Sequence, residues 1–147
     1  MSRVFLSTVA ANAAADAVAK LLDGGYMAIY EGAQPTSHDK PLPAGTKLLA
    51  TLQFGTPAFQ PASDGKAQAN AMKPDKDAND TGRPQWFRLF RTDSRTAVYD
   101  GDISTGPETA RQQRNAAMHM RALVIGKHAE VTIDSCVIRM PQSEARQ

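Results

Sequence analysis

The sequence predicts a mainly β fold: a β-sandwich or jelly-roll-like antiparallel domain that is preceded by one N-terminal α-helix. Three observations lead to this prediction. An alanine-rich run ends at the double glycine 24–25, and short apolar stretches with a period of two follow it. Loops that hold most of the 10 glycines and 9 prolines separate these stretches. Helical segments do not alternate with the strands, so the pattern disfavours an α/β architecture.

Length and composition limit the possible classes. The 147 residues correspond to one domain, and we expect an N-terminal arm (1–7), a single domain (8–141) and a C-terminal tail (142–147). The 17 basic and 15 acidic residues give a net charge of +2, which does not indicate a nucleic-acid partner. The sequence contains no apolar run near the roughly 20 residues that span a bilayer, and its start does not resemble a signal peptide. We therefore expect a soluble protein that is made in the cytoplasm and has no membrane partner.

The leading helix is expected over residues 8–23. Its alanines have the highest intrinsic helix propensity, Ser7 or Thr8 can cap its start, and Gly24-Gly25 can end it. One stripe is expected to be buried: Ala14, Ala15, Val18, Leu21 and Leu22. The small alanines would allow close approach to the protein's own sheet or to another chain, and packing on its own domain is the simpler interpretation.

Seven strands are expected, at residues 26–30, 48–54, 66–72, 85–91, 96–99, 118–124 and 129–140. The first is apolar on both faces, which predicts a place inside the sheet. In the second, Leu48, Ala50, Leu52 and Phe54 are expected to share the buried face.

The later strands carry more turn signals. Asp93-Ser94 is expected to join two strands as a hairpin, and Asp100-Gly101 to end the second of them. Residues 106–115 are ambiguous, with a short helix as one interpretation. Within the last strand the apolar positions change phase, which predicts a β-bulge near Ser135.

Candidate metal ligands are few. The run Asp75-Lys-Asp-Ala-Asn79 resembles the start of a calcium loop, but Asp80 stands where the loop needs glycine and Trp86 where it needs glutamate. His38, His119 and His128 lie at no metal-ligand spacing. We therefore interpret the acidic run as a solvated turn and expect neither a metal site nor a cofactor.

Catalytic motifs are also missing. The sequence contains no nucleophile elbow, phosphate loop or dinucleotide fingerprint, so we expect a protein that is not an enzyme. Cys136 falls in a predicted buried strand and is expected to be inert. An aromatic group with nearby arginines has two interpretations, a stacking platform for bases or sugars and a central strand packed on both faces, of which we prefer the second. Its members are Trp86, Phe87, Arg88, Phe90 and Arg91.

Several motifs resemble a family of small structural proteins of tailed-bacteriophage virions. The first half matches in the helix 12–25 with its double glycine, the strand-and-glycine segment 26–32, Gln34-Pro35 and the strand 48–52. The second half is similar in Trp86-Phe-Arg88, in 98–101 and in 132–140. The chain departs from the pattern between Gly106 and Met118, where an unusually polar stretch contains Arg111, Gln112, Gln113 and Arg114.

The resemblance implies a decoration or cement protein that binds the major capsid protein lattice at the capsid surface and stabilises the head. Members of this size are expected to act as homo-oligomers, either dimers or trimers. The interface residues that we infer are Arg3, Val4, Phe5, Pro35, His38, Pro41, Arg111 and Arg114. Two alternatives remain open: a carbohydrate- or receptor-binding module of a tail or head fibre, and a tail or baseplate component.

Overall fold

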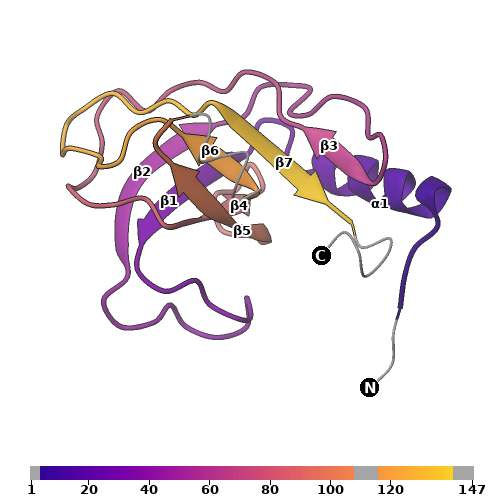
Figure 1. Ribbon diagram of the computed structural model, residues 1–147, viewed down its shortest axis with the longest axis horizontal. Coiled ribbons are helices and arrows are strands. Elements are labelled where there is room, and N and C mark those ends of the chain that lie inside the picture. Colours follow the sequence, from indigo (N-terminus) through magenta and orange to yellow (C-terminus); the bar gives the residue numbers. More distant parts are fainter. Residues whose placement is uncertain (1–3, 108–115, 141–147) are drawn as a thin grey trace.

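The computed structural model describes residues 4–107 and 116–140, in which one helix lies at the end of a curved sheet (Figure 1). The elements are α1 (Thr8–Leu21), β1 (Tyr26–Glu31), β2 (Lys47–Gln53), β3 (Lys66–Gln68), β4 (Trp86–Phe90), β5 (Ala97–Thr105), β6 (Met118–Met120) and β7 (Ser135–Arg139). The mainly β fold with an N-terminal helix is thereby confirmed.

All seven strands belong to one mixed sheet, in the order β2-β1-β4-β5-β6-β7-β3. Neighbouring strands are antiparallel except for β5 and β6, in which Ile103 pairs with Met118 and Thr105 with Met120 in the same direction. The expectation of a wholly antiparallel arrangement is wrong at this pair. The Asp102 carboxylate accepts a hydrogen bond from the Ala117 amide at 3.0 Å, which fixes the start of β6 beside β5.

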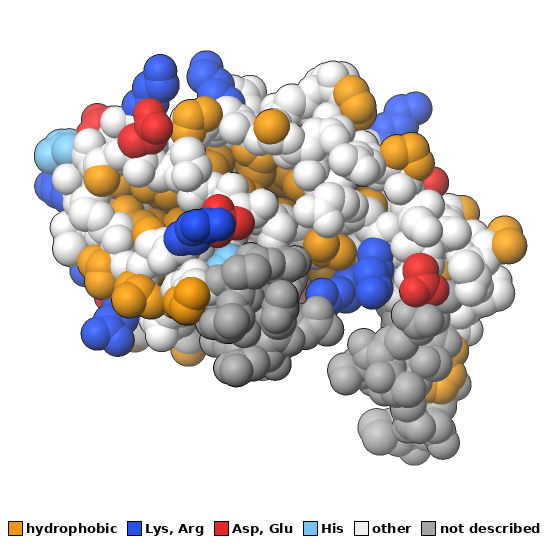
Figure 2. All heavy atoms as spheres, turned by 45° about the horizontal axis from the view of Figure 1, so that its top comes forward, with side chains coloured by type: hydrophobic (Ala, Val, Ile, Leu, Met, Phe, Trp, Pro, Cys, Tyr) orange, Lys and Arg blue, Asp and Glu red, His pale blue; other side chains and the backbone are white. Residues whose placement is uncertain are grey.

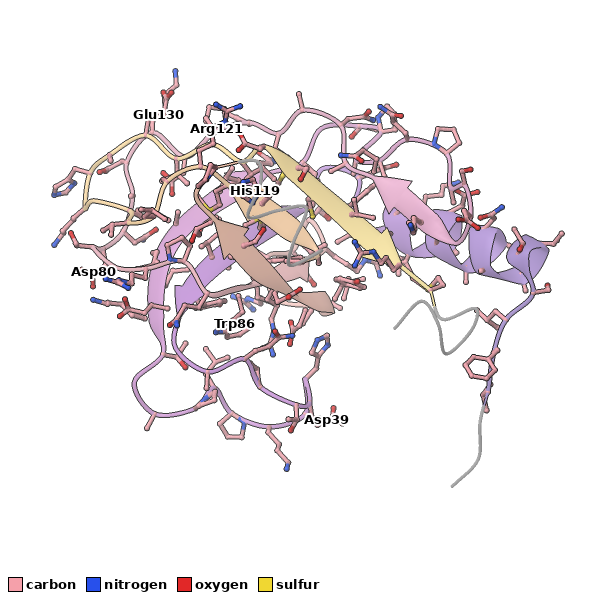
Figure 3. The ribbon with its side chains drawn as sticks, in the orientation of Figure 1. Asp39, Asp80, Trp86, His119, Arg121 and Glu130 are labelled. Atoms are coloured by element: carbon pink, nitrogen blue, oxygen red, sulfur yellow. The ribbon has the colours of Figure 1, made fainter. Side chains whose placement is uncertain are left out.

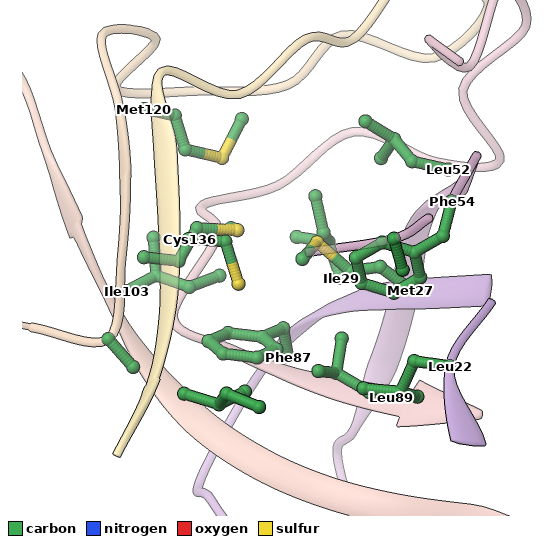
Figure 4. Close-up of a cluster of buried hydrophobic side chains, with 14 of the residues drawn as sticks. Leu22, Met27, Ile29, Leu52, Phe54, Phe87, Leu89, Ile103, Met120 and Cys136 are labelled. Carbon is green, nitrogen blue, oxygen red and sulfur yellow. The ribbon is translucent and has the colours of Figure 1, made fainter. Parts of the chain in front are cut away.

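The curvature of the sheet brings its two halves face to face across one apolar core. Figure 4 shows residues of β5, β6 and β7 facing residues of β1, β2 and β4, with Phe87 between them. The largest buried members are Leu22, Met27, Ile29, Leu49, Leu52, Phe87, Leu89, Met118, Met120 and Ile138. A single sheet therefore supplies the two-layer packing that the sequence predicts from sandwich-like patterning.

Helix α1 packs beside β3 and β7. Ser7 caps it, because its hydroxyl oxygen accepts a hydrogen bond from the Ala10 amide at 3.2 Å. The buried stripe is Ala11, Ala15, Ala19 and the following Leu22. The helix ends at Leu21, whose side chain is 43% exposed, so the prediction that Leu21 belongs to the buried stripe is wrong.

A bulge changes the expected phase of β2. Ile29 pairs with Ala50 and Tyr30 with Leu48, so Leu49 is the extra residue. As a result Leu49 is buried and Leu48 is exposed, the reverse of the predicted arrangement at these two positions.

Three later strands differ from their predicted bounds. Strand β5 continues past Asp100-Gly101 to Thr105, because Gly101 lies opposite Phe87 in the ladder instead of in a turn. Strands β3 and β6 stop after three residues each. Strand β7 starts only at Ser135, so the phase change there marks the start of the strand and not a bulge within a longer one.

The chain covers both terminal strands of its own sheet. Beyond β2, the Thr51 amide donates to the Asp75 carboxylate at 2.8 Å, and the Asn79 amide donates to the Leu49 carbonyl at 2.8 Å. Beyond β3, the Gln60 amide donates to the Gln68 carbonyl at 2.8 Å. Covered edges of this kind disfavour the addition of a strand from another chain.

The turn between β4 and β5 gives a prediction about pH. The Asp93 carboxylate accepts hydrogen bonds from the Thr96 hydroxyl and from the amides of Thr96 and Arg95, and these bonds lower its pKa from 3.8 to about 2. Because the folded pKa lies below the unfolded one, the stabilisation is complete above pH 4 or so and is lost as the pH falls toward 2. A titration of the Asp93 carboxyl by NMR should therefore have its midpoint near the lower value.

Thr96→Val tests the cause of this shift. The variant removes only the hydroxyl donor, so the pKa of Asp93 should rise part of the way back to its usual value. A wild-type midpoint near pH 4, or a Thr96→Val midpoint that equals that of the wild type, would contradict the assignment.

Candidate functional site

The predicted interface residues that the structure describes lie in two separate places. Val4 and Phe5 belong to the arm that precedes α1, where their side chains are 75% and 39% exposed. Pro35, His38 and Pro41 lie in the loop 32–46 between β1 and β2, at the other side of the molecule in Figure 1. Arg3, Arg111 and Arg114 lie outside the described residues.

Through His38, the loop 32–46 contacts a buried ion pair that joins β4 to β5. The Arg88 guanidinium donates to both oxygens of Asp100, at 2.8 and 3.0 Å, and both side chains are almost fully buried. His38 Nε2 lies 3.1 Å from Asp100 Oδ1. The hydrogen bond from Arg88 to Asp100 raises the pKa of the guanidinium further, so Arg88 stays charged. His38, predicted as a contact residue, therefore holds its own loop in place.

The aromatic group belongs to the packed sheet. Trp86 is completely buried, stacks on Tyr30 with ring centroids 4.5 Å apart, and carries Arg88 over its face at 5.4 Å. Burial raises the pKa of the Tyr30 hydroxyl. Phe87 points into the core on the opposite face of the sheet. The interpretation as a strand packed on both faces is confirmed, and a shielded Trp86 disfavours the carbohydrate-binding alternative, which needs an exposed ring.

The structure joins a serine and a histidine that sequence reasoning did not connect. The Ser104 Oγ and His119 Nδ1 atoms are 2.7 Å apart, and His119 Nε2 lies 3.0 Å from the Gly106 carbonyl oxygen. Because a carbonyl only accepts, Nε2 carries a proton, and in the neutral ring Nδ1 then accepts from the Ser104 hydroxyl. No spacing rule reveals this pair, because the partners face each other across the parallel strands β5 and β6.

This pair suits a structural role. Ser104 and His119 are completely buried, whereas a nucleophilic serine must be reached by its substrate. Asp134 Oδ2 lies 4.0 Å from His119 Nε2, too far for a hydrogen bond, and only 3.5 Å from Arg121 Nε. Figure 3 shows His119 within the sheet and Arg121 nearer the surface. The two buried side chains satisfy each other and fasten β6 to β5.

The acidic run 75–79 forms a hydrogen-bonded turn. Asp75 accepts hydrogen bonds from the Thr51 and Asp77 amides, and Asp77 Oδ1 lies 2.6 Å from His128 Nδ1. In residues 4–107 and 116–140 no cluster of three or more histidine, cysteine, aspartate or glutamate side chains is placed to hold a metal ion. Cys136 is completely buried, and burial raises the pKa of its thiol to about 12. The thiol is therefore protonated and unreactive at neutral pH.

An open groove of about 620 Å³ lies beside the end of β5. Its lining includes Gln34, Arg83, Gln85, Asp102, Leu123 and Val124. Gln85 Oε1 already accepts a hydrogen bond from the Gly32 amide, and Asp102 one from the Ala117 amide. Exposed Leu123 and Val124 add an apolar rim. This mixture of groups does not select one class of ligand.

No known family model, curated protein or solved structure matches this chain. The structure itself defines a mainly β protein with one curved mixed sheet and an N-terminal helix. The described part of the chain contains no helix with the length and hydrophobicity needed to traverse a bilayer.

Proposed function

We propose that the chain is a non-enzymatic structural protein of a tailed-bacteriophage virion, and that it binds the major capsid protein lattice as a decoration or cement protein. The observation that carries this proposal is the arm. Val4 and Phe5 expose apolar side chains on a segment that leads away from the sheet toward solvent (Figure 1). The sequence motifs that resemble virion proteins add to it.

The body of the protein supports a scaffold role. Two pairs of its buried polar side chains satisfy each other, Arg88 with Asp100 and Ser104 with His119, and its terminal strands are covered. A rigid body with an apolar extension suits attachment to a repeated lattice, because each copy needs only a small anchor. Binding that favours the assembled shell would stabilise the head by mass action.

Deletion of residues 2–6 tests the arm. Ser7 must stay, because its hydroxyl caps α1. The deletion removes Val4 and Phe5, each worth about 1.5–3 kcal/mol when fully buried at an interface. We therefore expect the number of copies per particle, measured by cryo-electron microscopy of purified virions, to fall at least tenfold at limiting protein concentration.

Leu123→Ser is the matched control. Leu123 is 63% exposed, between Val4 and Phe5, and lies in none of the predicted contact segments, so the variant should keep wild-type occupancy. Unchanged occupancy after the arm deletion would refute the arm as the anchor. Density at the tail or on a fibre, with none on the head, would refute capsid decoration and favour the tail or receptor-binding alternatives.

A further inference from the structure

Helix α1 has two apolar faces, and its own domain covers only one of them. The inner face packs on β3 and β7 through Ala11, Ala15 and Ala19. On the outer face, Val9 and Leu21 are 81% and 43% exposed. Hydrophobic side chains reach the surface at this end of the molecule (Figure 2). An apolar helix face that its own domain leaves uncovered is a candidate contact surface.

Two of the polar residues of α1 bind its own domain instead of solvating the outer face. Asn12 Oδ1 accepts a hydrogen bond from the Gly65 amide at 2.8 Å, and Asp16 Oδ1 accepts one from the Ala62 amide at 2.7 Å. Both side chains therefore fasten the helix to the loop that precedes β3. Lys20, the remaining charged residue of the helix, is exposed beside the outer row.

The outer face has a symmetric order of side-chain sizes. Val9, Ala13, Ala17 and Leu21 follow one another at intervals of four residues, so they form one row along the helix. The row reads large, small, small, large, and all four side chains are exposed. The order of large and small side chains is therefore the same when the row is read in either direction.

We propose that α1 pairs with α1 of a second copy of this chain, antiparallel about a two-fold axis. Val9 then faces Leu21 of the second copy, and Ala13 faces Ala17, so that the alanines let the two helices approach closely between larger side chains at each end. A two-fold interface uses the same patch on both subunits, which a palindromic row satisfies.

Charge favours the antiparallel direction. A parallel pair would place Lys20 against Lys20 of the second copy and align the two helix dipoles unfavourably. In the antiparallel pair Lys20 lies near Ala10 of the second copy, and the two ammonium groups are about 15 Å apart along the axis, at 1.5 Å per residue.

The contact is small. A helix of 14 residues is about 21 Å long, so a pair of such helices covers less surface than a standard stable interface. We therefore expect a dimer that dissociates on dilution in the micromolar range. The proposal concerns self-association of the isolated protein and does not depend on capsid binding.

Ala17→Glu tests the interface in solution. A carboxylate at the centre of the row should leave the protein monomeric at every concentration, whereas the wild type should shift from monomer to dimer as concentration rises in sedimentation velocity. Ala44→Glu adds the same charge at an exposed position in the loop 32–46 and should behave as the wild type. Circular dichroism checks that α1 stays helical. A wild type that stays monomeric, or an Ala17→Glu protein that dimerises equally, would overturn the proposal.

Disulfide trapping tests the direction of the helices. An equimolar mixture of Val9→Cys and Leu21→Cys proteins should form a covalent dimer under mild oxidation. Neither variant alone should do so, because Val9 and Val9 of the second copy are about 18 Å apart along the axis. Cys136 should not form a disulfide in this experiment, because it is buried. Dimers from the single variants, or none from the mixture, would overturn the antiparallel pair.

Discussion

Asp100→Asn is expected to lower the free energy of unfolding by about 3–5 kcal/mol. The side chain of Asp100 lies with that of Arg88 in the buried face beneath the loop 32–46, and its two oxygens accept two hydrogen bonds from the guanidinium. Asparagine keeps the size but turns one acceptor into an NH₂ donor that opposes the guanidinium. Arg88 is then a buried charge without a counterion, and chemical denaturation should report the loss.

Two further variants show whether the loss of stability comes from the unpaired buried Arg88 or from the removal of a negative charge in general. Asp77→Asn breaks the contact with His128, where both side chains are more than 70% exposed, and should stay within about 0.5 kcal/mol of the wild type. Arg88→Met combined with Asp100→Leu removes both partners and should recover most of the stability, because two well-packed apolar side chains replace the pair.

The loop 32–46 gives a second readout of the same change. His38 Nε2 contacts Asp100, so Asp100→Asn should also increase hydrogen exchange of the loop amides. If Asp100→Asn proves as mild as Asp77→Asn, the ion pair does not anchor this face of the sheet.

Local sequence signals predict four of the elements well. Strands β1, β2 and β4 and helix α1 fall within two residues of their predicted bounds, because a clear periodicity and turn residues such as Gly24-Gly25 mark them. The predicted strand at 96–99 ends too early, because the sequence alone does not distinguish a glycine within a strand, such as Gly101, from a glycine in a turn. What distinguishes them is the ring of Phe87, which lies across the ladder and leaves no room for a side chain.

Local periodicity and turn residues do not predict which strands pair or which side chains meet across them. Nothing in the sequence indicates that β6 runs parallel to β5, that Ser104 meets His119 or that His38 reaches Asp100, because each contact joins segments far apart in the chain. The two alanine rows of α1 have the same spacing, so periodicity could not tell which one faces the sheet. The loop before β3 determines which row faces the sheet, because its amides bind Asn12 and Asp16, which lie on one side of the helix.

Phe87→Ala is expected to lower the free energy of unfolding by about 3–5 kcal/mol. The ring is completely buried between the two halves of the sheet, and it lies near Tyr99 with centroids 6.4 Å apart (Figure 4). Truncation loses the burial of the ring and leaves a cavity, because hydrogen-bonded strands on both sides limit collapse. Denaturant unfolding measures the loss, and Val4→Ala in the exposed arm, within about 0.5 kcal/mol of the wild type, is the control.

Gly101→Ala shows whether the ring itself makes this glycine necessary. A Cβ atom at residue 101 would overlap the Phe87 ring and lie 2.9 Å from the Ala117 Cβ, so the single variant should lose about 1–3 kcal/mol through overpacking. In the Phe87→Ala background the same methyl group enters the cavity. The double variant should therefore be more stable than the sum of the two losses predicts, by 1 kcal/mol or so. Additive losses would mean that Gly101 is required for its backbone and not for the space that Phe87 occupies.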